Sequence, residues 1–428
     1  MQGKFSLVSE AKLSYNGRKK AGEAMIIGII GGGASGMAAA LTAAENKDNQ
    51  ILLFERQARV GRKLQATGNG RCNLSNLFAG SRGYHGDDPD FSGPALENLS
   101  PEQTLKWFAD LGLYTVAEPS GRVYPYSDQA NSVVDVLRFA LQKENIQLLT
   151  GCEVMRVRKQ EEGFLVEWED GSTVCDRIII ACGGLAGTKL GGSMSGYKLL
   201  RSFGHHCTRL RPALVQVKSD WRGCVSLKGV RTNCLAQILH NGELTAESVG
   251  ELQFAEYGLS GPVIFEISRD VCQGGGQWLC RLDFLPDIRE EALLSELQRR
   301  CQRGLPTEEL LTGILHNRLG RVLCAAAGVR GQKRSEELTR WELEAVCRAV
   351  KCFEVNLTDT MGMDSAQVTA GGIVTTEFEA KTMESKLVPG LYACGEVLDI
   401  DGDCGGYNLQ WAWSSGYLAG KFAGGLDV

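Results

Sequence analysis

Residues 31–36 read Gly-Gly-Gly-Ala-Ser-Gly and match the pattern G-x-G-x-x-G. An apolar run at 25–30 precedes them and predicts a β-strand, while the small residues that follow predict a helix. Gly31 permits the tight turn, Gly33 lets backbone amides approach a pyrophosphate, and Gly36 lets the helix pack close to the strand. A strand, a glycine turn and a helix in this order predict the start of a dinucleotide-binding βαβ unit.

A carboxylate occupies the position at which a dinucleotide-binding βαβ unit has an acidic residue. Glu55 ends the next predicted strand, 51–55, and follows Gly36 by nineteen residues. At that position it would accept hydrogen bonds from ribose hydroxyls. These features support a bound dinucleotide but do not distinguish FAD from NAD.

The start of the chain superficially resembles a signal peptide. Arg18, Lys19 and Lys20 precede an apolar stretch at 24–44. The glycines inside that stretch divide it into a strand and a helix, which excludes one continuous apolar segment. We therefore predict a polar N-terminal leader at 1–24, and no membrane association.

Composition places the chain among ordinary globular proteins. Hydrophobic residues make up 43% and charged residues 23% of 428 positions, which predicts two or three domains. Glycine is frequent, with 53 residues, but it lacks the repeat of collagen. A net charge of −5 argues against a protein that mainly binds nucleic acid. Fifteen cysteines without a C-x-x-C pair, and five scattered histidines, predict no disulfide framework, no metal site and a reducing cytoplasm.

The pattern along the chain predicts an α/β fold with insertions. Helical periodicity marks 104–117 and 131–145, alternation marks a β-meander at 151–174, and short alternating segments between 213 and 285 suggest a small antiparallel sheet or barrel. The predicted fold class is a Rossmann-like, glutathione-reductase-like dinucleotide domain with an inserted β-barrel domain and a helical subdomain. The predicted bounds are 25–195 and 361–428 for the first, 196–286 and 351–360 for the second, and 287–350 for the third.

Two segments far from the glycine turn favour FAD. The predicted strand 390–394 runs into Gly395-Glu396, and Gly405-Gly406 opens a helix at about 407–423. The N-terminus of that helix could stabilise negative charge on a flavin ring. A second polar glycine loop, Gly61-Arg-Lys-Leu-Gln-Ala-Thr-Gly-Asn-Gly-Arg-Cys-Asn73, offers donors for phosphate and flavin atoms.

These motifs together resemble the HI0933-like (YhiN/BaiN-type) family of FAD-dependent flavoproteins. The chain also shows Gly-Leu-Ser-Gly-Pro at 258–262, Thr-Ala-Gly-Gly at 369–372 and the long glycine-rich motif at 395–416, so the resemblance covers 25–425. The resemblance implies bound FAD. The cofactor-binding residues predicted on this basis are Gly31, Gly33, Ala34, Ser35, Gly36, Glu55, Arg56, Lys63, Thr67, Gly68, Asn69, Gly70, Arg71, Cys72, Asn73, Val154, Cys182, Gly183, Gly184, Gly395, Glu396, Asp401, Gly406, Tyr407, Asn408, Leu409 and Gln410.

The resemblance implies an oxidoreductase of one of two kinds. A reductase would use NADH or NADPH to saturate a C=C bond conjugated to a ketone, as in a steroid or bile acid, whereas an oxidase would act on a small amine such as aminoacetone. The many thiols slightly favour the reductase, because thiols persist in reducing cells. Tyr257 and Tyr407 are candidate proton donors by residue type and motif position, although packing is an alternative role for both.

An FAD-containing RNA-modifying protein is a third possibility. Arg318, Arg321, Arg330, Lys333 and Arg334 form a basic stretch without acids. However, residues 287–351 hold twelve basic and ten acidic residues, which favours a solvated helix surface. The predicted partner is a small-molecule substrate, without nucleic acid or membrane, and the catalytic residues stay unassigned.

Overall fold

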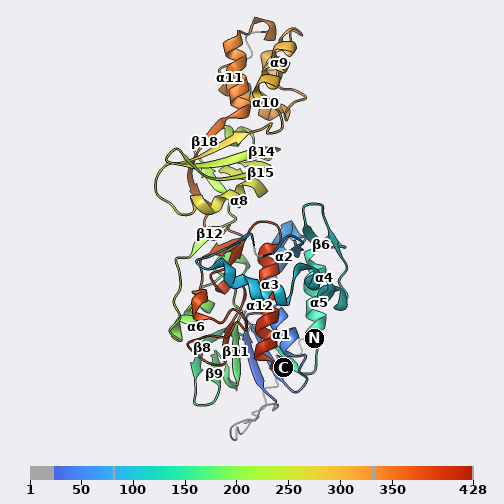
Figure 1. The fold of residues 1–428 in the computed structure, drawn as a ribbon, viewed down its shortest axis with the longest axis vertical. Coiled ribbons are helices and arrows are strands. Elements are labelled where there is room, and N and C mark those ends of the chain that lie inside the picture. Colours follow the sequence, from blue (N-terminus) through green and yellow to red (C-terminus); the bar gives the residue numbers. More distant parts are fainter. Residues whose placement is uncertain (1–23, 81, 330–333, 427–428) are drawn as a thin grey trace, which may run out of the picture.

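The computed structural model describes residues 24–80, 82–329 and 334–426. Figure 1 shows three units in order along the long axis: a large α/β unit, a β-barrel, and a helical unit. The chain enters the barrel through 214–216 and returns through 361–367. The predicted leader, except for its last residue, lies outside the described residues, as do Arg330 and Lys333.

The α/β unit contains a five-stranded parallel sheet with the order β20-β11-β1-β2-β7. Its strands are rich in isoleucine and leucine because helices cover one face and an antiparallel meander covers the other. Phe54 of the sheet meets Trp168 of the meander with 5.6 Å between ring centroids. The sheet strands are β1 (Ile26–Ile30), β2 (Gln50–Glu55), β7 (Ile146–Thr150), β11 (Arg177–Ile180) and β20 (Leu391–Ala393), and the meander strands are β8 (Val154–Lys159), β9 (Phe164–Trp168) and β10 (Gly171–Cys175).

Helices α1 (Ala34–Ala43) and α12 (Tyr407–Ala423) pack closely on one face of this sheet. Small residues make the close approach possible, since a Cβ atom on Gly416 or Gly420 would overlap a backbone oxygen of α1. Residues four apart lie on the same helix face, so these two glycines form one contact stripe. The N-terminal βα unit and the C-terminal helix are therefore one packed structure.

We predict that Gly420→Ala lowers the free energy of unfolding by at least about 2 kcal/mol, because the added methyl group would overlap the Ala39 carbonyl oxygen. Lys421→Ala is the control, since Lys421 is the next residue and is not fully buried. Thermal unfolding of the two variants and the wild type checks this. Equal midpoints for Gly420→Ala and wild type would show that α12 can move away from α1 at little cost.

Smaller elements complete the α/β unit around the ends of the parallel strands. The strand pairings are β3-β6-β5, β4-β21 and β12-β19. The strands are β3 (Ser75–Asn76), β4 (Tyr84–His85), β5 (Thr115–Ala117), β6 (Arg122–Pro125), β12 (Arg211–Ala213), β19 (Val368–Ala370) and β21 (Asp401–Gly402), and the helices are α2 (Arg62–Ala66), α3 (Gly93–Asn98), α4 (Pro101–Asp110), α5 (Ala130–Ala140) and α6 (Ser195–Ser202).

The inserted unit is a closed barrel with the strand order β13-β16-β15-β14-β17-β18. One continuous apolar core joins this barrel to the helical unit, with Phe284 and Leu293 among its members. The strands are β13 (Val217–Ser219), β14 (Arg231–His240), β15 (Glu243–Ala255), β16 (Gly258–Ser260), β17 (Trp278–Asp283) and β18 (Phe353–Thr360), and the helices are α7 (Gly223–Ser226), α8 (Pro262–Val271), α9 (Glu290–Cys301), α10 (Asn317–Ala326) and α11 (Arg340–Lys351).

The predicted α/β fold class with an inserted barrel and helices is confirmed. Two helix predictions were too long. The helix expected at 104–117 ends at Asp110, and residues 115–117 form strand β5, because Gly112 turns the chain with a φ of +96°. The helix expected at 131–145 ends at Ala140, so that strand β7 can begin at Ile146. Among the described helices, none has the length and apolar character required to cross a bilayer.

Candidate functional site

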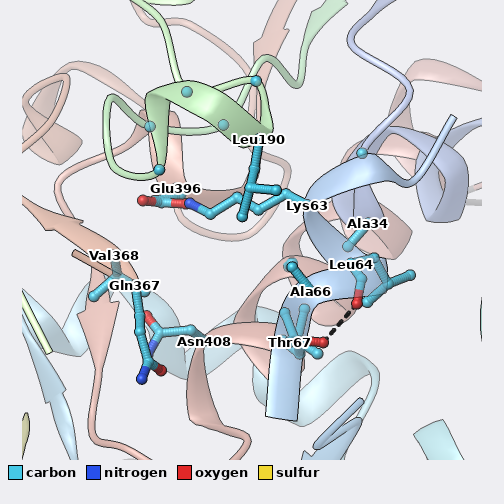
Figure 2. A pocket seen from close by; sticks show the side chains of 18 of the residues that line it. Ala34, Lys63, Leu64, Ala66, Thr67, Leu190, Gln367, Val368, Glu396 and Asn408 are labelled. Atoms are coloured by element: carbon cyan, nitrogen blue, oxygen red, sulfur yellow. Dashed lines mark hydrogen bonds and ion pairs between the residues drawn. The ribbon is translucent and has the colours of Figure 1, made fainter. Parts of the chain in front are cut away.

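A cavity of about 910 Å³ extends from the glycine turn after β1 to the wall of the barrel. This volume lies near the upper end of the range for ligand sites, about 300–1,000 Å³. Figure 2 shows part of its lining, with Lys63 of α2 reaching toward Glu396. The predicted residues that line it are Gly31, Gly33, Ala34, Ser35, Glu55, Arg56, Lys63, Thr67, Gly68, Asn69, Arg71, Asn73, Val154, Cys182, Gly183, Gly184, Glu396, Gly406, Asn408 and Leu409.

The N-terminus of α1 opens into this cavity. Gly33 is the N-cap residue, and no side chain in the described part of the protein caps the helix, so its first backbone N–H groups keep their capacity to bind an anion. A Cβ atom on Gly33 would have no neighbour within 4 Å. Open space beside an uncapped helix end is what a pyrophosphate requires.

Glu55 is held in place by two backbone amides. Its carboxylate accepts hydrogen bonds from Gly32 N at 2.8 Å and from Gln57 N at 2.7 Å. Because the side chain is oriented before any ligand arrives, little conformational entropy is lost when a ribose hydroxyl binds. This geometry suits the role predicted for Glu55.

Lys63 and Glu396 connect the second glycine loop to the C-terminal segment. Lys63 Nζ lies 2.8 Å from Glu396 Oε2, and Thr369 N donates to Glu396 Oε1 at 2.8 Å. A Cβ atom on Gly184 would lie 2.5 Å from the same carboxylate, so glycine leaves room for it. Glu396 therefore joins three segments and positions Lys63 at the cavity.

The start of α12 forms another part of the lining. Gly406 takes a φ of +106° as the N-cap residue, and no side chain caps this helix either. Nearby, Asn73 Oδ1 is buried and has no hydrogen-bond partner among the described residues. A buried amide oxygen without a partner costs free energy, which a hydrogen-bonding ligand would recover. Two uncapped helix ends, the open space at Gly33 and the unpartnered Asn73 fit an extended FAD.

Several predicted residues lie outside the lining, and their surroundings explain why. Tyr407 packs its ring against Tyr84, with centroids 5.8 Å apart. Gln410 is fully buried and donates to Leu99 O at 3.0 Å. Helical spacing turns these two side chains away from the cavity that Asn408 and Leu409 face. The predicted residues that do not line the cavity are Gly36, Gly70, Cys72, Gly395, Asp401, Tyr407 and Gln410.

The remaining residues of that group serve the structure around the site. Cys72 is fully buried, and burial raises the pKa of its thiol to about 12, so it stays a neutral core residue. Asp401 is buried and forms an ion pair with Arg269 of α8. A Cβ atom on Gly36 would overlap the Gly31 carbonyl oxygen, and one on Gly395 would meet Ser35.

The barrel supplies a wall from which only Tyr257 had been singled out by sequence as a candidate residue. The described cavity residues from the barrel side include Gln216, Arg231, Gln253, Tyr257 and Phe265. Strand β6 adds Arg122 and Tyr124. The alternation of β6 could have revealed the latter pair, because Val123 between them is fully buried. Tyr257 is thus at the cavity as a proton donor requires, whereas Tyr407 is not.

Comparison with known proteins identifies the family of this chain. The family model described as HI0933-like protein Rossmann domain matches residues 25–422. The chain belongs to the HI0933-like family. The resemblance found in the motifs is thereby confirmed, and the protein is a flavoprotein oxidoreductase of that family.

The relatives that match this chain are named for two different activities. A 3-dehydro-bile acid delta(4,6)-reductase of Clostridium scindens is 40% identical over 93% of this chain and 98% of its own. A ribosomal RNA dihydrouridine synthase of Escherichia coli is 31% identical over 92% of this chain and 96% of its own. A protein of the same name from Haemophilus influenzae is 27% identical over 91% and 96%.

Proposed function

We propose that the protein saturates a C=C bond conjugated to a ketone in a steroid-like or bile-acid-like substrate, with NADH or NADPH as electron donor. The cavity carries this proposal, because it continues past the predicted FAD residues to a barrel wall that includes Tyr257, Pro262 and Phe265. Apolar surface with a few polar groups is typical of small-molecule sites. The 40% identity to a bile-acid reductase supports the substrate class.

The chain's own residues supply orientation and proton chemistry. When bound, FAD provides the hydride that this reaction needs. Burial raises the pKa of Tyr257, so its hydroxyl stays protonated at neutral pH and can donate to the substrate. The N-terminus of α12 places a positive field at the cavity, which favours negative charge developing there. We place the reaction in the cytoplasm, since all fifteen cysteines are free thiols.

Reduction of a uridine in RNA is the second candidate. Uracil also holds a C=C bond conjugated to a carbonyl, and two relatives are named for making dihydrouridine in ribosomal RNA. The basic stretch of the helical unit offers little support, because its described members are already engaged. Arg321 pairs with Glu309, and Arg334 donates to Gly304 O at 2.6 Å. We therefore propose a small-molecule substrate and no nucleic-acid partner.

Anaerobic spectroscopy tests this proposal. We expect the FAD-loaded protein to lose its yellow colour with NADH or NADPH, and to regain it when a 3-keto steroid with a conjugated C=C bond is added. Saturated 3-keto steroid is the matched control and should not restore the colour. Recovery with ribosomal RNA alone would favour the second candidate, and bleaching by aminoacetone but not by NADH or NADPH would favour an amine oxidase.

A further inference from the structure

Among the described residues, six cationic side chains line the cavity, and five of them have protein partners. Arg122 is the exception: within the described residues its guanidinium makes no hydrogen bond and no ion pair. An arginine normally pairs when it is partly buried, because its charge is costly to leave unpaired. The five paired cations are Arg56 with Glu153 and Gly191, Arg62 with Gln57, Lys63 with Glu396, Arg71 with Asp128 and Glu118, and Arg231 with Glu251.

The position of Arg122 follows from the strand that carries it. The side chains of β6 alternate, so Arg122 lies on the cavity side while Val123 is in the core. The guanidinium lies against the loop before α12. The closeness is seen at Gly405, where an added Cβ atom would lie 3.0 Å from Arg122 Nε. Asn76 Nδ2 donates to Gly405 O at 2.8 Å and holds that loop in place. Arg122 thus lies beside the uncapped end of α12.

This end of the cavity is also the one nearest the barrel. Glu266 of α8 accepts a hydrogen bond from Cys404 N at 3.3 Å, one residue before the glycine that Arg122 lies against. Phe265, the neighbour of Glu266, lines the cavity. Arg122 therefore lies where the α/β unit and the barrel meet, on the side that a substrate would share with the barrel wall.

The acidic groups near Arg122 compensate its positive charge only in part. Burial, and then the nearby Asp403, raise the pKa of Glu266 to about 7, so this carboxyl is partly neutral. Asp403 is engaged with His85, whose Nε2 lies 2.7 Å from its Oδ1. Burial also raises the pKa of the Cys404 thiol to about 12, so it carries no charge. A guanidinium and a helix N-terminus then act together on whatever binds here.

We propose that Arg122 binds the carbonyl oxygen of the substrate and stabilises the charge that forms on it. This inference rests on the proposed function. A hydride added to the β-carbon of the C=C bond moves the π-electron pair toward the carbonyl, which becomes an enolate with its negative charge on oxygen. A proton from Tyr257 or water then adds to the α-carbon and restores the ketone, so the substrate gains two electrons and two hydrogens. Arg122 donates to the oxygen throughout and keeps its own proton.

Two measurements on FAD-loaded protein test this role. The first is the rate at which an enone steroid reoxidises protein already reduced by NADH or NADPH. The second is the absorption difference spectrum of bound 2-naphthol against the FAD-loaded protein alone; the naphthol anion imitates an enolate and absorbs at a longer wavelength than the neutral form. We expect Arg122→Ala to retain FAD and to be reduced at the wild-type rate. Its reoxidation should be at least about 100-fold slower, as for loss of an oxyanion donor, and bound naphtholate should disappear near neutral pH.

Two further variants make the result decisive. Arg122→Lys keeps the charge, so we expect it to restore part of the naphtholate signal and part of the reoxidation rate. Arg138→Ala removes an exposed arginine of α5, which pairs with Asp135 outside the cavity, and should match wild type. Unchanged naphtholate binding in Arg122→Ala would overturn the proposal, and so would loss of FAD or a changed flavin reduction rate. If wild type itself fails to react with every enone, the proposed function fails, while the naphtholate comparison still decides whether Arg122 binds an oxyanion.

Discussion

Gly33→Ala is expected to leave the folded chain as stable as wild type and to raise the dissociation constant for FAD at least about 100-fold. The backbone of Gly33 has a φ of −81°, which alanine adopts without strain. Its added Cβ atom would meet nothing in the protein within 4 Å, so it would project into the space predicted for the pyrophosphate. The expected loss corresponds to about 2.8 kcal/mol of binding free energy.

Thermal unfolding without cofactor and titration of the apoprotein with FAD measure the two effects separately. Gly80→Ala is the matched control, because a Cβ atom there would also meet nothing within 4 Å but the residue is exposed and lies outside the cavity. We expect that control to match wild type in both measurements. Undiminished FAD affinity in Gly33→Ala would place the pyrophosphate somewhere other than at the start of α1.

Gly36→Ala should instead lower the stability of the folded protein. Its Cβ atom would overlap the Gly31 carbonyl oxygen and would approach the Ala181 Cβ atom at 3.3 Å. The first turn of α1 must then move away from the end of β1, at a cost of about 3 kcal/mol for forced overpacking. We expect a lower unfolding midpoint without cofactor, together with weaker FAD binding, since the helix end that faces the anion is displaced.

The two glycine variants therefore separate a binding role from a structural role within one motif. Only Gly36→Ala should lower the stability of the apoprotein, although both should bind FAD poorly. Excess FAD should partly restore the midpoint of Gly36→Ala, because a ligand that binds only the folded state stabilises it. A Gly36→Ala protein as stable as wild type would show that α1 adjusts to the methyl group without distorting the turn.

Short-range sequence patterns predicted the parts of the candidate site that depend on backbone conformation. The glycine turn, Glu55 and the start of α12 were all predicted, because each depends on the conformation or spacing of residues close together in the chain. The helix predicted at 104–117 was too long for a related reason. Periodicity alone continues through a helix end, and the positive φ of Gly112 overrode it.

The sequence motifs did not predict which of their side chains line the cavity. Tyr407 and Gln410 belong to the same glycine-rich segment as Asn408, yet they lie outside the cavity lining to which Asn408 belongs. Cys72 and Asn73 are adjacent, and one is core whereas the other lines the cavity. A motif specifies residue identity, but which face of a helix or loop is covered depends on the segments that pack against it.

From its amino-acid order alone, this chain could be assigned to a family and a fold class, and a glycine turn could be predicted as an FAD site, because glycine patterns and strand-helix alternation are short-range properties. The opposite wall of the cavity depends on folding. Arg122 of the α/β unit is far in sequence from Tyr257 and Phe265, and the three line one cavity only because the barrel packs beside the α/β unit. That Arg122 has no partner among the described residues is likewise visible only in three dimensions, since an unpaired charge is defined by what surrounds it.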